Sequence, residues 1–348
     1  MWDADRLIQL ARDAGLDLAG AVLAGPSPRW EAYRAWLEKG YAAEMEYLAR
    51  PDAVAKREDP RRILPGAQTM LVVAASYAGP PPPSLRPLHG RVSRYAWGPP
   101  PDYAGGADYH RWILRRLEAL IRAIEDELGG PVTSRAYVDT GPVLERAWAE
   151  AAGLGWAGKN TNLIHPRLGS FLFLGVALLA VRLPLAPQGD LPGCGTCTRC
   201  IDVCPTGAIV APGVLDARRC LSYLTIEHRG AIPEDLRPAM GTRLFGCDTC
   251  QDVCPWNQGP IAAFQGVPAP EIATLYLPDL LTMDGAEFRA RFRHTAIWRA
   301  TPTGLARNAA VVLGNLGDSA AKPHLARAAE SHPSALVREH AVWALGRL

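Results

Sequence analysis

Cysteine is the residue type whose spacing in this 348-residue sequence points most directly to chemistry. Residues 194–205 read CGTCTRCIDVCP, and a shorter run at 247–255 reads CDTCQDVCP. The first run has the spacing C-x2-C-x2-C-x3-C-P, which binds iron–sulfur clusters. Thiolates are soft ligands that suit iron. The two runs therefore predict iron–sulfur clusters and transfer of single electrons.

The spacing of these cysteines also distributes them between two clusters. The fourth cysteine of such a run ligates the other cluster. Cluster 1 is therefore expected to take Cys194, Cys197, Cys200 and Cys254. Cluster 2 takes Cys204, Cys247 and Cys250, and the only cysteine left for its fourth position is Cys220. Eight cysteines thus fill two [4Fe–4S] sites with none left over.

Disulfides and zinc are the alternative uses of these thiols. The start of the chain, MWDADRLIQLARDAGLD, predicts an amphipathic helix rather than a signal peptide. We therefore expect a cytoplasmic protein, in which thiols stay reduced and disulfides are rare. Zinc sites separate their two C-x-x-C pairs by a finger, whereas the first run is tightly serial.

The first 185 residues are expected to bind the group that these clusters reduce. A strand is predicted at 69–77, a long amphipathic helix at 108–129, a strand at 134–140, a helix from Gly141-Pro142 to about Gly153, and an apolar strand at 170–181. Alternating strands and helices favour an α/β fold with a sheet covered by helices. Two clusters need only a small domain, so a region of this size argues for catalysis.

The rest of the chain divides into two regions of different composition. Residues 186–262 collect all eight cysteines among turn residues and depend on metal centres more than on an apolar core. Residues 270–348 are rich in Ala, Leu and Arg, and 304–318 partly matches 335–348. This weak repeat predicts stacked helix pairs of HEAT type, with an ordinary helical bundle as the alternative.

Charge and hydropathy limit the partners. The net charge of +2 gives no whole-protein signal for nucleic acid, so any such surface must be local. Arginines gather between 286 and 307 with His294 and Trp298 interleaved, which suits phosphate contact and base stacking. A solvated helix face is the alternative. The longest apolar run, 171–181, is too short to cross a membrane.

Motif spacing does not identify the electron acceptor. No G-x-G-x-x-G follows a predicted strand, there is no P-loop, and the cobalamin motif Asp-x-His-x-x-Gly is absent, because Ile113 stands where its glycine would be.

Longer stretches of the sequence resemble the epoxyqueuosine reductases. They are KREDPRRILPGAQTMLVVAASY (56–77), DYH (108–110), VDTGPVLERAWAEAAGLGWAGKNTNLI (138–164), CLSYLTIEHRGAIP (220–233), CDTCQDVCPWN (247–257) and RNAAVVLGN (307–315). The resemblance runs nearly from end to end in the same order. It implies a cobalamin-dependent enzyme with two [4Fe–4S] clusters, which reduces epoxyqueuosine to queuosine at the tRNA wobble position and is related to the reductive dehalogenases.

The resemblance also implies the fold and the partners. Residues 1–185 would form a nitroreductase-like α/β cobalamin domain, 186–262 a bacterial ferredoxin-like two-cluster domain, and 270–348 a HEAT-like helical domain that contacts tRNA. The partners would be a tRNA anticodon stem-loop carrying epoxyqueuosine and an external low-potential electron donor of ferredoxin or flavodoxin type. We expect a monomer. Without the Asp-x-His-x-x-Gly motif, cobalamin is expected base-off with no protein histidine on its metal.

Site residues follow from the same resemblance. Asp139 is expected to donate a proton to the opening epoxide, with a pKa raised by burial beside the corrin, whereas the residues alone favour a capping or turn role. The residues expected against cobalamin are Asp139, Gly158, Lys159, Asn160, Ser222, Tyr223 and, on weaker grounds, Arg57. The residues expected to contact tRNA come from the local charge between 286 and 307 rather than from the resemblance, and they are Arg289, Arg291, Arg293, Arg299 and Arg307.

Two points of the resemblance stay open. The segment PPPDYAGGA (99–107) is an insertion relative to the family pattern, in a position that could alter the pocket rim or the approach of tRNA. The alternative functions are a reductive dehalogenase-like enzyme acting on a small organohalide and a ferredoxin-like electron carrier.

Overall fold

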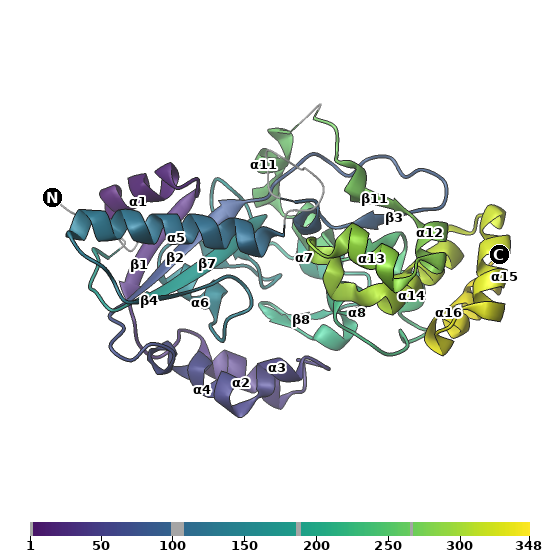
Figure 1. Ribbon diagram of the computed structural model, residues 1–348, viewed down its shortest axis with the longest axis horizontal. Coiled ribbons are helices and arrows are strands. Elements are labelled where there is room, and N and C mark those ends of the chain that lie inside the picture. Colours follow the sequence, from purple (N-terminus) through teal and green to yellow (C-terminus); the bar gives the residue numbers. More distant parts are fainter. Residues whose placement is uncertain (1–2, 99–107, 186–188, 265–266) are drawn as a thin grey trace.

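The elongated shape of the molecule is seen in the computed structural model, which describes residues 3–98, 108–185, 189–264 and 267–348. The chain begins at one end of the long axis and finishes at the other (Figure 1). The predicted insertion at 99–107 lies outside the described residues, and so do 186–188 and 265–266.

A four-stranded sheet forms the core of the N-terminal part. Its order is β1 (Leu18–Leu23), β2 (Thr69–Ser76), β7 (Leu172–Leu179) and β4 (Ser134–Tyr137), and each pair of neighbours is antiparallel. The predictions of β2, β4 and β7 are confirmed. The sequence analysis missed β1, whose sequence LAGAVL is rich in alanine and glycine, two residue types with low strand propensity.

Helices cover both faces of this sheet. The helices α1 (Ala4–Asp13) and α5 (Tyr109–Leu128) pack on one face, and α6 (Glu145–Ala151) packs on the other. The long helix α5 confirms the prediction for 108–129: the Asp108 side chain accepts from the backbone N–H of His110, and Gly129 ends the helix at a φ of 73°.

The helix predicted from Gly141 starts later than expected. Its first residue is Glu145, and residues 138–144 form bends between β4 and α6. The predicted start at Gly141-Pro142 was therefore wrong, although proline suits a first turn. The consequence is functional, because Asp139 lies in this irregular segment rather than at a helix cap.

A second, three-stranded sheet joins segments that lie far apart in the sequence. β3 (His89–Val92) pairs with β10 (Arg243–Phe245) in parallel and with β11 (Thr274–Tyr276) in antiparallel. Residues around β3 share an apolar core with the C-terminal helices. The predicted domain limits stay predictions, and this sheet shows that the segment around 88–97 packs with the C-terminal half.

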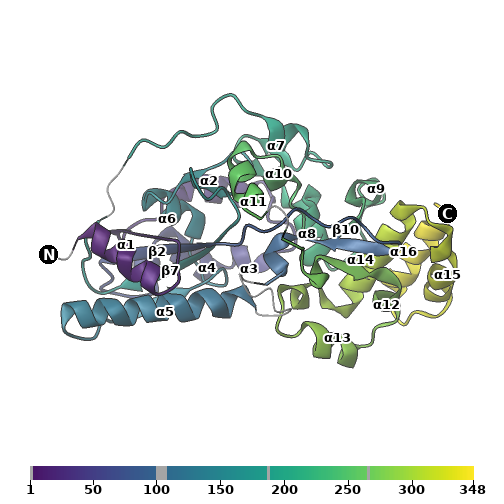
Figure 2. The same cartoon turned by 90° about the horizontal axis from the view of Figure 1, so that it is seen from above.

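The cysteine-containing segments lie between the four-stranded sheet and the C-terminal helices (Figures 1 and 2). Their elements are short: α7 (Arg199–Asp202), β8 (Ile209–Ala211), β9 (Val214–Leu215), α8 (Leu221–Ile226), α9 (Arg237–Met240), α10 (Thr249–Asp252) and α11 (Gln258–Ala262). The pair of β5 (Trp156–Ala157) and β6 (Leu163–Ile164), which comes earlier in the chain and holds no cysteine, is equally short. The part around α8 and α9 still buries Leu221, Leu224 and Met240 in the apolar core that it shares with the C-terminal helices. The dependence of this region on metal centres therefore stays a prediction.

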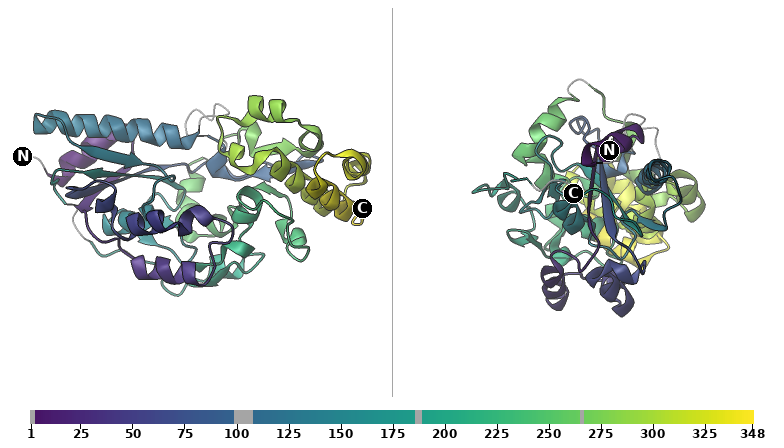
Figure 3. Two further views of the ribbon diagram at one scale, coloured as in Figure 1. Left: turned by 60° about the horizontal axis from the view of Figure 1, so that its bottom comes forward. Right: turned by 90° about the vertical axis from the view of Figure 1, so that its left-hand side faces the viewer.

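Helices form the C-terminal end of the molecule (Figure 3). They are α12 (Leu277–Thr282), α13 (Gly285–Phe292), α14 (Thr301–Leu316), α15 (Lys322–Ser331) and α16 (Ala335–Leu345). The N-terminal part adds α2 (Trp30–Glu38), α3 (Glu46–Ala49) and α4 (Pro51–Glu58). The chain is thus a mixed α/β protein with a helical C-terminal part. Among the described residues, no helix combines the length and the apolar character that crossing a bilayer requires.

Candidate active site

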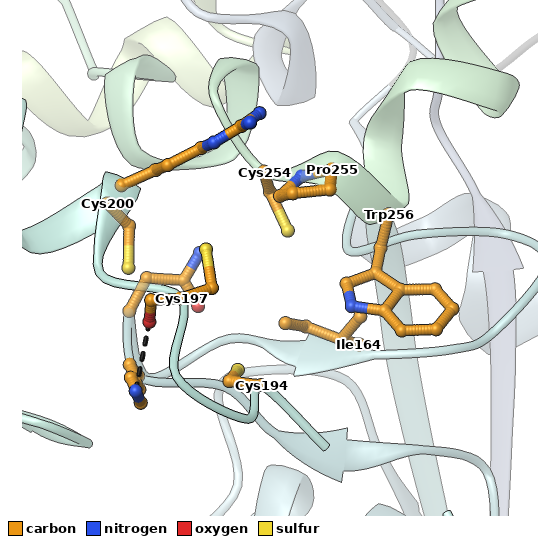
Figure 4. Close-up of a pocket in the computed structure, with 10 residues that line it drawn as sticks. Ile164, Cys194, Cys197, Cys200, Cys254, Pro255 and Trp256 are labelled. Atoms are coloured by element: carbon orange, nitrogen blue, oxygen red, sulfur yellow. Dashed lines mark hydrogen bonds between the residues drawn. The ribbon is translucent and has the colours of Figure 1, made fainter. Parts of the chain in front are cut away.

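Four of the predicted cluster ligands line one pocket. Cys194, Cys197, Cys200 and Cys254 surround it together with Ile164 and Trp256, and Figure 4 shows the labelled cysteines around the pocket. Their thiols interact electrostatically with one another: burial and the charges of the other three raise the pKa of Cys200. This is the set that the spacing rule assigns to cluster 1.

A buried donor beside this pocket fits a cluster. The indole N–H of Trp156 is buried and has no hydrogen-bond acceptor among the described residues. Trp156 packs in one apolar group with Cys254, Cys194 and Trp256. A buried donor without a partner is costly, and the sulfur atoms of a bound cluster are acceptors. In the described residues no three His, Cys, Asp or Glu side chains are grouped to hold a single metal ion.

The remaining four cysteines form the second group. Burial raises the pKa of Cys220 to about 11, and the charges of Cys247 and Cys204 add to the effect. Burial also raises the pKa of Cys250, again with contributions from Cys247 and Cys220. Cys204 of the first run thus lies with the cysteines of the second run, as the crossing rule expects. Buried thiols with raised pKa values need the positive charge of bound iron to stay ionised.

The segment Gly158–Asn160 connects the two cluster-binding loops. The Lys159 ammonium donates to the carbonyls of Gly195 at 2.8 Å and Cys197 at 2.9 Å. The Asn160 amide Nδ2 lies 3.4 Å from the carbonyl of Cys250. The sequence analysis expected Lys159 against cobalamin, but in the structure its ammonium is engaged with carbonyls of the first cysteine run.

The glycine of this segment has a local packing reason. A Cβ atom at Gly158 would lie 2.5 Å from Ile164 Cδ1 and 2.7 Å from Asn160 Oδ1. Such distances are shorter than contacts between real atoms permit. A side chain at this position would have to displace the ends of the Ile164 and Asn160 side chains, so the local packing favours glycine whether or not a cofactor approaches its backbone.

Asp139 stands at the centre of a group of ionisable side chains. It has a φ of 58°, an uncommon backbone conformation for a residue other than glycine. Its backbone N–H donates to Glu145 Oε1 at 2.7 Å, which secures that conformation. The hydroxyl of Tyr109 donates to Asp139 Oδ2 at 2.8 Å, and His110 Nε2 lies 3.5 Å from the same oxygen.

Protons are not distributed over this group as the sequence analysis expected. Surrounding protein atoms partly desolvate Asp139 and oppose its ionisation, but the hydrogen bonds from His110 and Tyr109 outweigh this effect and lower the pKa of Asp139. The prediction of a raised pKa was therefore wrong for the protein alone. The Asp139 side chain is 65% exposed, so one side of it faces open space.

The proton resides on the neighbours of Asp139. Burial alone would lower the pKa of His110, but its hydrogen bonds to Asp108 and Asp139 raise that pKa to about 9. Burial, followed by the charge of Asp139, raises the pKa of Glu145 to about 8. These shifts favour an imidazolium at His110 and a protonated carboxyl at Glu145 beside an ionised Asp139.

Sequence reasoning gave no role to Tyr109, His110 and Glu145. The first two form part of the stretch DYH (108–110), which was noted only as a resemblance. The signal that could have identified them is the Asp-x-His spacing at a helix start, which places the histidine within reach of its own N-cap carboxylate. Nothing local in the sequence brings Asp139 to them.

Arg57 has a buried hydrogen-bond donor that a bound anion or carbonyl group would satisfy. Its side chain is buried, yet Nη1 has no hydrogen-bond partner among the described residues. The guanidinium lies 5.8 Å from the centre of the Tyr33 ring, and its charge acts on Glu145. An orphaned buried cation near the Asp139 group is what a site for the amides or phosphate of a large cofactor requires.

The segment after Cys220 is only partly available to a ligand. The hydroxyl of Tyr223 accepts from the backbone N–H of Glu44 at 3.1 Å, and its ring is buried. Ser222 is half-buried at the start of α8, beside the second cysteine group. Tyr223 therefore holds the segment 41–45 in place, and the contact of Ser222 with cobalamin stays a prediction.

The five arginines expected to contact tRNA do not form one surface. Arg289, Arg291 and Arg293 are exposed on or just after α13. Arg299 is bound to Glu227 by two hydrogen bonds of 2.8 and 2.9 Å.

The structure corrects the prediction that Arg307 contacts tRNA. Arg307 is 1% exposed and donates to the backbone carbonyls of Leu224, His228 and Gly230. A side chain buried in this way cannot reach RNA, so the prediction for Arg307 was wrong. Its function is structural: it joins α14 to the segment that carries Cys220.

Family comparisons agree with this arrangement. Residues 193–257 match the family described as a 4Fe-4S double cluster binding domain, and residues 57–140 match the family described as epoxyqueuosine reductase QueG.

Curated relatives match over nearly the full length. The chain is 41% identical to the epoxyqueuosine reductase of Pseudomonas aeruginosa, with 99% of this chain and 95% of the relative covered. It is 38% identical to that of Escherichia coli, with 99% and 90% covered.

Solved structures agree in fold. A crystal structure of an epoxyqueuosine reductase with an epoxyqueuosine-modified tRNA stem loop superposes with a TM-score of 0.85 at 32% identity, covering 99% of this chain and 89% of the other. The Streptococcus thermophilus structure gives a TM-score of 0.85 at 28% identity, with 98% and 89% covered. On the identity and coverage of these relatives, the chain belongs to the epoxyqueuosine reductase family.

Proposed function

We propose that this chain is an oxidoreductase that reduces epoxyqueuosine to queuosine at the wobble position of tRNA. The observation that carries the proposal is the match of 99% of the chain to curated epoxyqueuosine reductases. A relative of the same fold has been solved with an epoxyqueuosine-modified tRNA stem loop. This similarity favours the function over a dehalogenase of small organohalides or a ferredoxin-like carrier.

The clusters supply electrons one at a time in this proposal. Cluster 1 is held by Cys194, Cys197, Cys200 and Cys254, and cluster 2 by Cys204, Cys220, Cys247 and Cys250. The pocket that the first four line and the mutual interactions of the second four support this assignment. The charge interaction between Cys250 and Cys200 supports close spacing of the two clusters.

Cobalamin, when bound, turns single electrons into the two-electron reduction that loss of an epoxide oxygen requires. Arg57, Asn160 and Ser222 are the residues we assign to hold it, together with the open side of Asp139. The orphaned guanidinium nitrogen of Arg57 supports a bound acceptor there. The cofactor is proposed base-off. Both ring nitrogens of His110 face carboxylates, so this histidine is not offered as a metal ligand.

Asp139 is proposed to pass a proton to the epoxide oxygen. The reaction takes two electrons and two protons and releases one water. His110 Nε2 holds a proton beside Asp139 Oδ2, and Tyr109 donates to the same oxygen. When the bound nucleoside excludes water, the Asp139 carboxylate loses solvation and becomes a better acceptor for the His110 proton. Asp139 then delivers that proton to the opening ring.

The finer assignments of fold and partners belong to the same proposal. The fold is a nitroreductase-like cobalamin domain (1–185), a ferredoxin-like two-cluster domain (186–262) and a HEAT-like helical domain (270–348). The packing of α16 on both α14 and α15 supports the last. The protein is proposed to act as a cytoplasmic monomer that receives electrons from an external ferredoxin or flavodoxin.

A genetic experiment tests the proposed function. A strain lacking its own epoxyqueuosine reductase is given the wild-type gene or the Asp139→Asn gene, and its tRNA nucleosides are measured by mass spectrometry. Queuosine restored only by the wild-type gene supports the proposal. Epoxyqueuosine that persists with the wild-type gene, while the protein is present with its iron and corrin, contradicts it.

A further inference from the structure

A basic pocket lies beside the Asp139 group and is not used by the chemistry above. It has a volume of about 260 Å³ and is formed by the first turns of α5 and the residues that follow α13. Figure 2 shows the start of α5 directed toward α13. The lining side chains are Asp108, Arg111, Trp112, Arg115, Arg116, Arg293 and His294.

Three of its arginines have no structural task. Arg111, Arg115 and Arg293 are exposed, and their guanidinium groups make no hydrogen bond or ion pair with the residues that the structure describes. By contrast, Arg116 donates to the carbonyl of Gly15 and stacks on the Trp112 ring at 3.7 Å. One arginine thus builds the wall of the pocket, and three present donors to it that no described residue engages.

The acidic side chain of the pocket does not neutralise these cations. Asp108 Oδ1 is 2.6 Å from His110 Nδ1, and the imidazolium of His110 takes up its charge. Arg111 also acts on Asp108 and lowers its pKa, but His110 contributes more. Three cations without a counter-ion among the described residues converge here from α5 and from the segment after α13. They repel one another unless an anion lies between them.

We propose that Arg111, Arg115 and Arg293 hold a backbone phosphate of the substrate RNA next to the reacting nucleotide. The inference deepens the proposed function and rests on it. Guanidinium groups suit phosphate because they offer paired N–H donors to two oxygens. Phosphate contacts position a nucleic acid without reading its sequence.

The location of the pocket determines which part of the RNA it takes. Asp108 lines the pocket and also binds His110, which lies beside Asp139. The anion site and the proton-transfer group therefore share one side chain. A nucleotide splayed from the loop toward Asp139 would leave its own flanking phosphate at the start of α5. Arginines that hold this phosphate would also orient the attached sugar toward Asp139.

Arg115→Glu tests this inference, with Arg122→Glu as the matched control. Arg122 is exposed on the same helix and does not line the pocket. Binding of an unmodified anticodon stem-loop RNA to the holoenzyme is measured between low and physiological salt. Arg115→Glu should weaken binding by about tenfold or more and flatten the slope of log Kd against log salt by about one unit. Arg122→Glu should leave both near the wild-type values.

The outcomes separate the possible ligands and the underlying function. Equal losses in the two variants, with equal melting temperatures, would overturn the inference. Inorganic phosphate that displaces the stem-loop RNA when both are present at the same concentration would identify a site for free phosphate. This result would also overturn the inference. A wild-type protein that binds the RNA with the predicted dependence on Arg115 but never reduces epoxyqueuosine would contradict the proposed function and leave the phosphate site standing.

Discussion

His110 lies between two carboxylates: its Nδ1 is 2.6 Å from Asp108 Oδ1 and its Nε2 is 3.5 Å from Asp139 Oδ2. Asp108 and His110 belong to the start of α5, whereas Asp139 follows β4. The sheet brings the two segments together, because β4 and α5 both pack on β7. A proton held on His110 is thus one step from the carboxylate that faces open space.

Replacing Asp139 removes the last carrier of that proton. Asp139→Asn is expected to lower turnover by about 10²–10⁴-fold, because asparagine cannot donate a proton to the epoxide oxygen. Absorption spectra and iron content should stay those of the wild type. The measurement is single-turnover conversion under anaerobic conditions, with exposed Asp126→Asn on α5 as control. Near-normal turnover of Asp139→Asn would refute the assignment.

The pKa of His110 predicts a dependence on pH. Because that pKa is raised from 6.5 to about 9, turnover should fall as the pH rises through about 9. The same shift stabilises the fold: the contribution is complete below about pH 6.5 and is lost as the pH rises through about 9. His110→Gln should remove both dependences. A pH–rate profile unchanged by His110→Gln would show that another group supplies the proton.

The assignment of the cysteines to two groups predicts that replacing any ligand of the same cluster changes the EPR spectrum in the same way. Cys194→Ser and Cys254→Ser should both disturb cluster 1, although the residues lie in different runs. Cys204→Ser and Cys220→Ser should both disturb cluster 2. Each variant should retain about half the iron, since each cluster holds half of it. EPR of the reduced proteins distinguishes the sets. A Cys254→Ser spectrum that matches Cys204→Ser instead would contradict the crossed assignment.

Lys159 should influence cluster 1 through its charge and its two hydrogen bonds. Lys159→Met removes a half-buried cation from the pocket wall, so the midpoint potential of cluster 1 should fall and iron should be lost faster to a chelator. Arg199→Met is the control, because Arg199 lines the same pocket but is exposed and screened by solvent. Potentials measured by EPR titration that shift equally in both variants would show that the hydrogen bonds are unimportant.

Arg307 predicts a loss of stability rather than of RNA binding. Arg307→Met leaves the carbonyls of Leu224, His228 and Gly230 without their donor, at a cost of about 2–5 kcal/mol. The melting temperature should fall clearly. Exposed Arg289→Met should melt like the wild type. Unchanged melting of Arg307→Met would contradict the structural role described above.

Spacing in the sequence was enough to predict the ligand sets of the cysteines, because the three short intervals of the first run match a cluster-binding pattern without knowledge of the fold. It was also sufficient for β2, β7 and α5, whose apolar patterns are long. Asp139 required more. It was predicted to end a strand directly before a helix, and the side chains that set its pKa come from α5, about 30 residues earlier.

The predictions for Lys159 and Arg307 also depended on contacts that only the fold creates. The carbonyls that bind Lys159 lie 36 and 38 residues further along the chain, so only the fold could place them. Arg307 carried a local warning, since it stands in LARNAAVVL, where apolar residues cover every face of α14. A cation in such a helix is buried with partners more often than it is free.

Anaerobic turnover of purified protein tests the central claim most directly. The protein, loaded with cobalamin and iron–sulfur clusters, is given a low-potential reductant and an anticodon stem-loop RNA carrying epoxyqueuosine, and the nucleosides are measured by mass spectrometry. The proposal predicts that epoxyqueuosine disappears and that queuosine, lighter by one oxygen atom, appears in equal amount. Unchanged epoxyqueuosine with both cofactors loaded and reduced would contradict it.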